Sequence, residues 1–176
     1  MKPNYKKNLK FITLLLSALI IATVSAATYS YMYIDGSITI GAQKLIWMEG
    51  TDAPSDISIS GGTVTMDLDV EAGTIQNFTE CLFLKNQDSA AHNLTIIVTT
   101  DASTSTFDVV KIYIYENSTG SWLYVDTLDV TVLNDEYSTY TGTPLGAGNY
   151  YRLTFEVKAK TGTSGTHNFD IKVTYE

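Results

Sequence analysis

The feature that most constrains the fold is a strict alternation of apolar and polar residues that recurs along most of the chain. It is clearest in residues 63–70, 93–99, 110–115, 151–158 and 168–175. Alternation with a period of two places successive side chains on opposite faces of a strand. Each stretch therefore predicts a strand with one buried and one solvated face.

Turn-forming residues stand between these stretches, among them Asp35-Gly36, Asn117–Gly120 and Gly146–Asn149. Gly, Asn and Asp accept the positive φ angles that tight hairpins need. No helical period follows the N-terminal segment, so the chain is predicted to be an antiparallel β-sandwich of roughly eight to ten strands. The apolar positions change parity between Val125 and Leu128, which predicts a bulge near Asp126-Thr127.

The N-terminal segment has the pattern of a secretory signal. Four lysines precede an apolar run from Phe11 to Val24, and small residues follow up to Ala26. We expect residues 1–26 to be a signal peptide that is removed after Ala26, so that the protein is secreted to the extracellular space or cell surface. The alternative is an uncleaved membrane anchor, because no charge occurs between Lys10 and Asp35.

The composition argues against several classes of partner. Removal of residues 1–26 leaves 7 basic and 19 acidic residues, a net charge of −12, which disfavours nucleic acid and anionic lipid. Contact with the membrane is expected only during export or if the signal is uncleaved. Cys81 is the only cysteine, so no internal disulfide can form, and a packing role is expected for it.

No catalytic motif is present, and we expect neither enzymatic activity nor a cofactor. His92 and His167 are expected at loop edges rather than as a pair. Asp67, Asp69 and Glu71 line one strand face, where calcium is conceivable, but a linear array of carboxylates favours a solvated surface over a metal site.

Two groups of residues suggest surface roles. Asn77, Asn93 and Asn117 each begin an Asn-x-Ser/Thr triplet, so they are candidate sites for N-linked glycans. Tyr113 and Tyr115 share one outward face, and Trp122 and Tyr124 share another across the turn. If the two strands pair, these four residues, with Trp47 as a further candidate, form an exposed aromatic patch suited to sugar stacking or to subunit packing.

The first segment after the signal is uncharged and apolar on both faces, which is unusual for a free N-terminus. It comprises Thr28, Tyr29, Ser30, Tyr31, Met32, Tyr33 and Ile34. One interpretation is a local hairpin through Asp35-Gly36 onto Ser37–Ile40. The other is a donor strand that fills a groove in the next subunit. Burial of its five large side chains would contribute roughly 8–15 kcal/mol, against an association cost of about 4–15 kcal/mol.

Three parts of the sequence resemble the TasA-like filament subunits, which include bacterial biofilm-matrix fibre proteins and archaeal bundling pilins. They are the signal with Ala27–Ile34, the run Ala72–Phe78 leading into Leu82–Asn86, and the closing strands. The resemblance implies a jelly-roll-like sandwich whose N-terminal strand complements the neighbouring subunit. It therefore implies a homopolymer with itself as its partner.

We thus expect a signal peptide at residues 1–26, a candidate donor strand at 27–36 and one β-sandwich domain at 37–176. The expected function is that of a structural subunit of an extracellular filament, a pilus or a biofilm-matrix fibre. One alternative is a secreted or membrane-anchored module that binds polysaccharide or a cell surface. The other is a type IV pilin-like subunit that keeps its hydrophobic segment as a packing helix.

Overall fold

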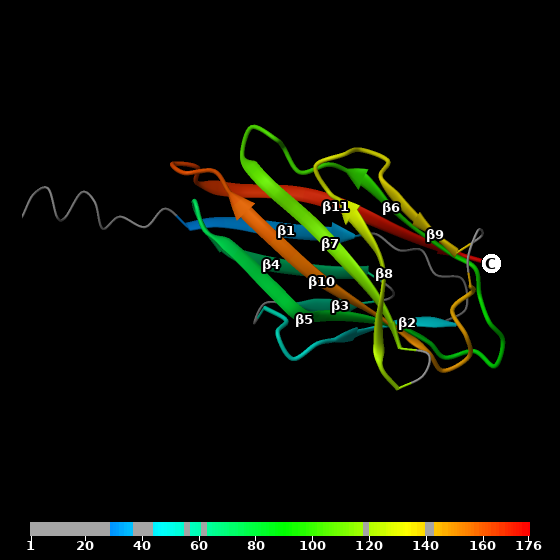
Figure 1. The fold of residues 1–176 in the computed structure, drawn as a ribbon. Helices are drawn as coiled ribbons and strands as arrows, with labels where there is room; N and C mark the ends of the chain where they lie inside the picture. Colours follow the sequence, from blue (N-terminus) through cyan, green and yellow to red (C-terminus); the bar gives the residue numbers. More distant parts are fainter. Residues whose placement is uncertain (1–28, 37–43, 55–56, 61–62, 118–119, 140–142) are drawn as a thin grey trace, which may run out of the picture.

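The computed structural model describes residues 29–36, 44–54, 57–60, 63–117, 120–139 and 143–176. The predicted signal peptide, Thr28 and the proposed hairpin partner Ser37–Ile40 lie outside these residues. The described residues form an all-β sandwich of two sheets without a helix (Figure 1). The predicted fold class is therefore confirmed.

The six-stranded sheet has the order β3-β4-β1-β11-β6-β9. Its strands are β1 (Tyr29–Gly36), β3 (Ser58–Ser60), β4 (Thr63–Glu71), β6 (Leu94–Thr100), β9 (Glu136–Ser138) and β11 (Gly165–Tyr175). All neighbouring strands are antiparallel except β1 and β11, which run parallel.

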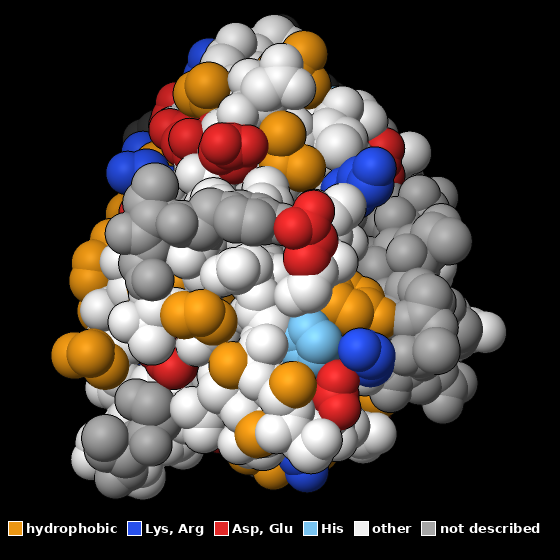
Figure 2. Space-filling view, turned by 90° about the vertical axis from the view of Figure 1, so that its right-hand side faces the viewer, with side chains coloured by type: hydrophobic (Ala, Val, Ile, Leu, Met, Phe, Trp, Pro, Cys, Tyr) orange, Lys and Arg blue, Asp and Glu red, His pale blue; other side chains and the backbone are white. Residues whose placement is uncertain are grey.

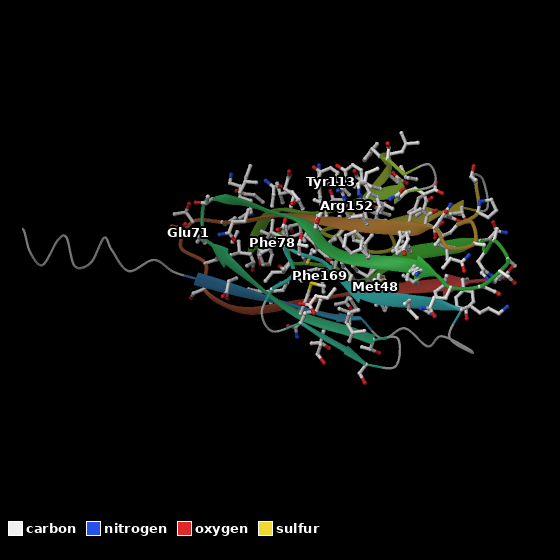
Figure 3. The ribbon with its side chains drawn as sticks, turned by 90° about the horizontal axis from the view of Figure 1, so that it is seen from below. Met48, Glu71, Phe78, Tyr113, Arg152 and Phe169 are labelled. Atoms are coloured by element: carbon white, nitrogen blue, oxygen red, sulfur yellow. The ribbon has the colours of Figure 1, made fainter. Side chains whose placement is uncertain are left out.

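The five-stranded sheet is antiparallel throughout and has the order β2-β5-β10-β7-β8. Its strands are β2 (Leu45–Glu49), β5 (Ile75–Asn86), β7 (Phe107–Asn117), β8 (Trp122–Asp129) and β10 (Tyr150–Ala159). The two layers are seen nearly edge-on in Figure 3.

All five alternating stretches are strands, but two expectations needed correction. The described residues hold eleven strands rather than eight to ten, because β2, β3 and β9 are too short to show an alternating pattern. The sandwich is not purely antiparallel, because β1 pairs in parallel with β11. The bulge predicted near Asp126-Thr127 is confirmed: Tyr115 pairs with Tyr124 and Ile114 with Asp126, so the extra residue of β8 is Val125.

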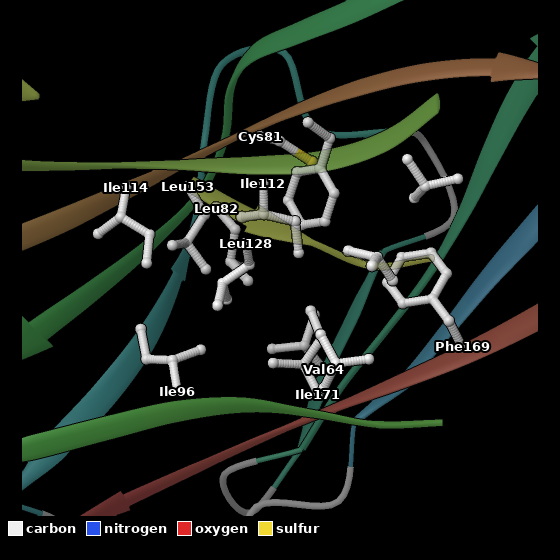
Figure 4. Packing of buried hydrophobic residues seen from close by; sticks show 14 of the residues in the cluster. Val64, Cys81, Leu82, Ile96, Ile112, Ile114, Leu128, Leu153, Phe169 and Ile171 are labelled. Carbon is white, nitrogen blue, oxygen red and sulfur yellow. The ribbon is translucent and has the colours of Figure 1, made fainter. Parts of the chain in front are cut away.

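The core lies between the sheets and is built from the inward residues of the alternating stretches. Met66, Leu68, Ile112 and Phe155 are all fully buried, and Figure 4 shows the side chains of the two sheets packed against each other. Burial of alternate residues on both layers is what holds two twisted sheets face to face.

A pair of tyrosines links the two sheets by a hydrogen bond within this core. The hydroxyl groups of Tyr137 in β9 and Tyr151 in β10 lie 2.9 Å apart, and the two rings meet edge to face. Burial raises the pKa of both hydroxyls. The pair satisfies two buried polar groups that would otherwise destabilise the core.

Candidate functional site

The candidate donor strand occupies an interior position of the six-stranded sheet. β1 pairs antiparallel with β4 from Tyr29↔Glu71 to Gly36↔Val64, and parallel with β11 from Ser30↔Gly165 to Ile34↔Phe169. Figure 1 shows β1 between these strands. Among the described strands, β4 and β11 are joined only through β1, so the sheet without β1 would consist of two pieces.

The two walls of this position carry part of the core. Met66, Leu68 and Val70 of β4 are fully buried, as is Phe169 of β11. Ser30, Met32 and Ile34 are the register partners of Val70, Leu68 and Met66. A vacant position would expose two unpaired strand edges beside these apolar side chains, which is an unstable arrangement.

The local hairpin, one of the two interpretations of this segment, does not fit the pairing found for β1. Both of its edges are already paired, one with β4 and the other with β11, so no edge remains for a strand that follows Asp35-Gly36. The turn chemistry of Asp-Gly was the basis of the hairpin interpretation, but long-range pairing takes both sides of the strand.

The aromatic patch, which comprises Tyr113, Tyr115, Trp122 and Tyr124, lies on the outer side of the five-stranded sheet. The strands β7 and β8 pair antiparallel, and the rings of Tyr115 and Tyr124 meet edge to face with centroids 5.9 Å apart. Tyr124 is 53% exposed. Burial, followed by the charge of Glu156, raises the pKa of Tyr113.

Arg152 lies at the centre of the patch and holds it together. Its guanidinium carbon is 4.5 Å from the ring centroid of Tyr115 and 4.8 Å from that of Trp122. Trp122 also stacks on Phe83, with centroids 5.6 Å apart. Cation–π contacts of this kind fix the rings in place on the outer face of the sheet (Figure 3, where Tyr113 and Arg152 are labelled).

Arg152 is held in turn by a bulge in β5. Leu82 pairs with Leu153 and Phe78 with Phe155, so Thr79, Glu80 and Cys81 lie opposite Thr154 alone. The bulge turns Glu80 toward the patch, and its carboxylate lies 3.8 Å from the Arg152 guanidinium.

The segment that follows β2 clamps this bulge. The Gly50 and Asp52 amides donate to the carbonyls of Cys81 and Glu80 at 3.1 and 3.0 Å. A Cβ at Gly50 would lie 1.7 Å from the Glu80 carbonyl oxygen, so only glycine fits here. The Asp52 carboxylate accepts from the Thr79 hydroxyl, which lowers the pKa of Asp52.

Trp47 does not belong to the patch. Its side chain points into the core from β2 and is only 9% exposed. The suggestion that it joins an exposed aromatic platform is therefore wrong, because β2 is too short for its sequence to show which face is buried.

The three candidate glycosylation residues lie in different surroundings. Asn77 is exposed near the start of β5 and pairs with Glu156. Asn93 is half-buried, and both its backbone amide and its carbonyl pair with Glu176. Asn117 is the last residue of β7, where it pairs with Tyr150 on one side and Trp122 on the other.

His92 and His167 have separate packing roles. His92 precedes β6 and is buried, with Nε2 2.8 Å from Asp88 and Nδ1 3.0 Å from the Glu176 carbonyl. Hydrogen bonds from His92 and then Lys44 lower the pKa of Asp88 to about 2. His167 lies in β11 and meets the ring of Phe107 edge to face. Figure 2 views the end of the molecule where a histidine lies beside charged side chains.

The acidic face of β4, for which the sequence favoured a solvated surface over a calcium site, is solvated at the two residues whose side chains are described. Asp69 and Glu71 are exposed on β4 and pair with Tyr31 and Tyr29 of β1. In the described ranges, no group of three or more His, Cys, Asp or Glu side chains is arranged to hold a metal ion. Likewise, none of the described segments contains a helix long and apolar enough to cross a membrane.

Cys81 is fully buried, with its sulfur 3.5 Å from that of Met66. Burial raises the pKa of its thiol to about 12. Since the thiolate is the reactive form, we expect a maleimide at pH 8 to label Cys81 at least ~100-fold more slowly in the native protein than in urea. Labelling can be followed by mass spectrometry. Native and denatured rates within about tenfold of each other would contradict this placement.

The sequence analysis missed three residues whose contacts become visible only in the structure. Phe83 and Arg152 complete the aromatic patch; both lie at outward positions of their strands, but the strand order that unites them with Tyr115 is not visible in the sequence. Asn86 is a fully buried polar residue at the end of β5. The only indication of Asn86 in the sequence was the turn-forming composition of the residues around it.

Comparison with known proteins supplies no further assignment, because no family model matches the chain and no curated protein matches it significantly.

Proposed function

We propose that this chain is a structural subunit of an extracellular filament, and that it polymerises when β1 of one subunit fills the position between β4 and β11 of the next. The observation that carries the proposal is that a segment near the predicted mature N-terminus forms an interior strand. In the part of the sheet that the structure describes, β4 and β11 have no other connection.

The position between β4 and β11 specifies its occupant closely. An incoming strand must be antiparallel to β4 and parallel to β11, and its register is set over both edges. A second copy of β1 meets these requirements by identity, since its own chain already accommodates it. Backbone pairing would supply affinity, and the alternating side chains of the strand would supply specificity.

Exchange of β1 between copies produces a head-to-tail contact. Each subunit gives one strand and receives one, so the contact leads to an open filament unless the rotation between subunits closes a ring. The eight residues 37–44 join β1 to β2 and span at most about 29 Å when extended. The resemblance to TasA-like subunits and the predicted signal peptide agree with this function.

A pair of cysteines distinguishes strand exchange from strand retention. Tyr31 of β1 and Asp69 of β4 are direct register partners, so Tyr31→Cys with Asp69→Cys is expected to form a disulfide wherever β1 is seated. In fibres of the mature chain, oxidation should yield a covalent ladder on a non-reducing gel. In dilute monomer it should yield one internal crosslink.

The single variant Asp69→Cys is the matched control and should give no ladder. Negative-stain microscopy of the same samples establishes whether fibres are present. If the double variant forms only the internal crosslink at every concentration and no fibres appear, β1 is an ordinary structural strand and the proposal fails.

A further inference from the structure

The aromatic patch and one of the glycosylation triplets, which the sequence presents as separate features, meet at Asn117. The residue pairs directly with Trp122 on β8 and with Tyr150 on β10. Tyr115 precedes it by two residues, so both side chains lie on the same face of β7. Three aromatic residues therefore surround the Asn117 side chain on the outer face of the sheet.

These rings are held in place before any ligand arrives. Arg152 contacts both Tyr115 and Trp122, Phe83 stacks on Trp122, and the Lys85 ammonium lies 5.1 Å from the ring centroid of Tyr150. The rings of Tyr115, Trp122 and Tyr150 remain partly exposed. Aromatic ring faces are electron-rich, so they attract the polarised C–H groups on the flat side of a sugar ring.

We propose that Asn117 carries an N-linked glycan whose first sugars pack on Trp122, Tyr115 and Tyr150. The donor is a lipid-linked oligosaccharide whose anomeric carbon is bonded to a phosphate oxygen. The Asn117 amide nitrogen attacks this carbon, and a C–N bond forms as the C–O bond breaks. The lipid phosphate leaves with the electron pair, and the amide proton passes to a base of the transferase.

Asn117 is better suited to this role than the other two triplets. It is the last residue of β7, and Ser118 and Thr119 complete the triplet in the sequence. Asn77 lies within a paired strand, and Asn93 is half-buried between backbone hydrogen bonds. Neither has aromatic register partners on both sides.

The position of the acceptor identifies the chain's own glycan as the occupant of the patch. A sugar attached at Asn117 is tethered among the rings, so its effective concentration there far exceeds that of a free polysaccharide. Exposed aromatic surface is a liability for a secreted protein, and a tethered sugar would cover it. The inference requires export but not polymerisation, so it and the filament proposal can fail independently.

The test begins with protein exported by a host that performs N-glycosylation. Peptide mass spectrometry is expected to find Asn117 occupied. Comparison with Thr119→Ala, which keeps Asn117 but destroys the triplet, should show that the glycan raises the melting temperature by about 2–4 °C. In a Trp122→Ala background the same comparison should show a shift below about 1 °C, because the coupled partner is absent.

Tyr124→Ala is the matched control, because Tyr124 belongs to the same patch but is not a register partner of Asn117. It should leave the effect of the glycan intact. A second measurement uses the unaltered glycoprotein, so it does not depend on whether the variants fold. In its NMR spectrum, the signals of the first sugar should be shifted by the ring currents of the aromatic residues.

Two results would overturn the inference. One is exported protein in which Asn117 is unmodified. The other is an occupied Asn117 whose sugar signals are unshifted and whose stabilising effect is the same with and without Trp122. A third result would assign the patch to an external ligand instead. In that case Asn117 is unmodified in the exported wild-type protein, and the Thr119→Ala protein binds free polysaccharide saturably.

Discussion

Deletion of Thr28–Ile34 from the mature chain is expected to abolish fibre formation and to destabilise the folded monomer by at least about 5 kcal/mol, which is comparable to the whole stability of a typical domain. The deletion leaves β4 and β11 without their common neighbour and opens the core beside Met66 and Leu68. Urea denaturation of the full-length and truncated chains, at a concentration that keeps both monomeric, measures the loss.

A synthetic peptide of Thr28–Ile34, the segment that the deletion removes, is expected to restore stability to the truncated chain and to block fibre growth by the full-length chain. The same peptide with Met32→Pro is the control. Proline removes a backbone donor from a strand that is paired on both edges, so this peptide should do neither. A truncated chain that unfolds at the same urea concentration as the full-length chain would refute the interior role of β1.

Replacement of Asn86 by alanine is expected to lower the free energy of unfolding by about 2–4 kcal/mol, because it removes a set of hydrogen bonds made by one fully buried side chain. The Asn86 Nδ2 lies 2.8, 2.9 and 3.2 Å from the carbonyl oxygens of Ala90, Leu145 and Gly146. Its Oδ1 accepts from the Asp88 amide at 2.9 Å. One side chain thus joins the end of β5 to the loop that leads into β10.

Two neighbouring substitutions make the Asn86 prediction specific. Gln87→Ala changes an exposed side chain and should stay within about 0.5 kcal/mol of wild type. Asn86→Asp keeps the shape of the side chain but directs an oxygen at three carbonyl oxygens, so it should destabilise at least as much as alanine. Urea denaturation provides the free energies. A loss below about 1 kcal/mol for Asn86→Ala would show that water replaces the amide without cost.

The aromatic patch shows how much the local sequence pattern can predict about a surface. Parity alone placed Tyr113 with Tyr115 and Trp122 with Tyr124, since residues two apart share a strand face. It said nothing of Arg152, because Arg152 meets Tyr115 only through the pairing of β10 with β7. Trp47 marks the opposite failure: its strand is five residues long, and its buried face is set by the pairing of β2 with β5.

The N-terminal strand shows the same difference between local sequence pattern and long-range strand pairing. Its composition alone indicated an unusual end segment that needs apolar surroundings on both faces. The Asp35-Gly36 turn signal favoured a local hairpin, and a local rule has no means of weighing a partner more than a hundred residues away, such as β11. Pairing with β4 and β11 prevails because it satisfies both edges of the strand.

The sequence by itself determined the all-β class, the places of β4, β6, β7, β10 and β11, the core-facing residues of those strands, and the atypical character of the N-terminal segment. These properties depend on residues that are close together in the chain, where a period of two can be recognised. Only the tertiary structure decided which strands are neighbours, that β1 alone connects β4 with β11, and that Arg152 and Asn117 both lie among the rings of the aromatic patch. Such juxtapositions arise from burial of the whole core at once, so no local stretch of sequence contains them.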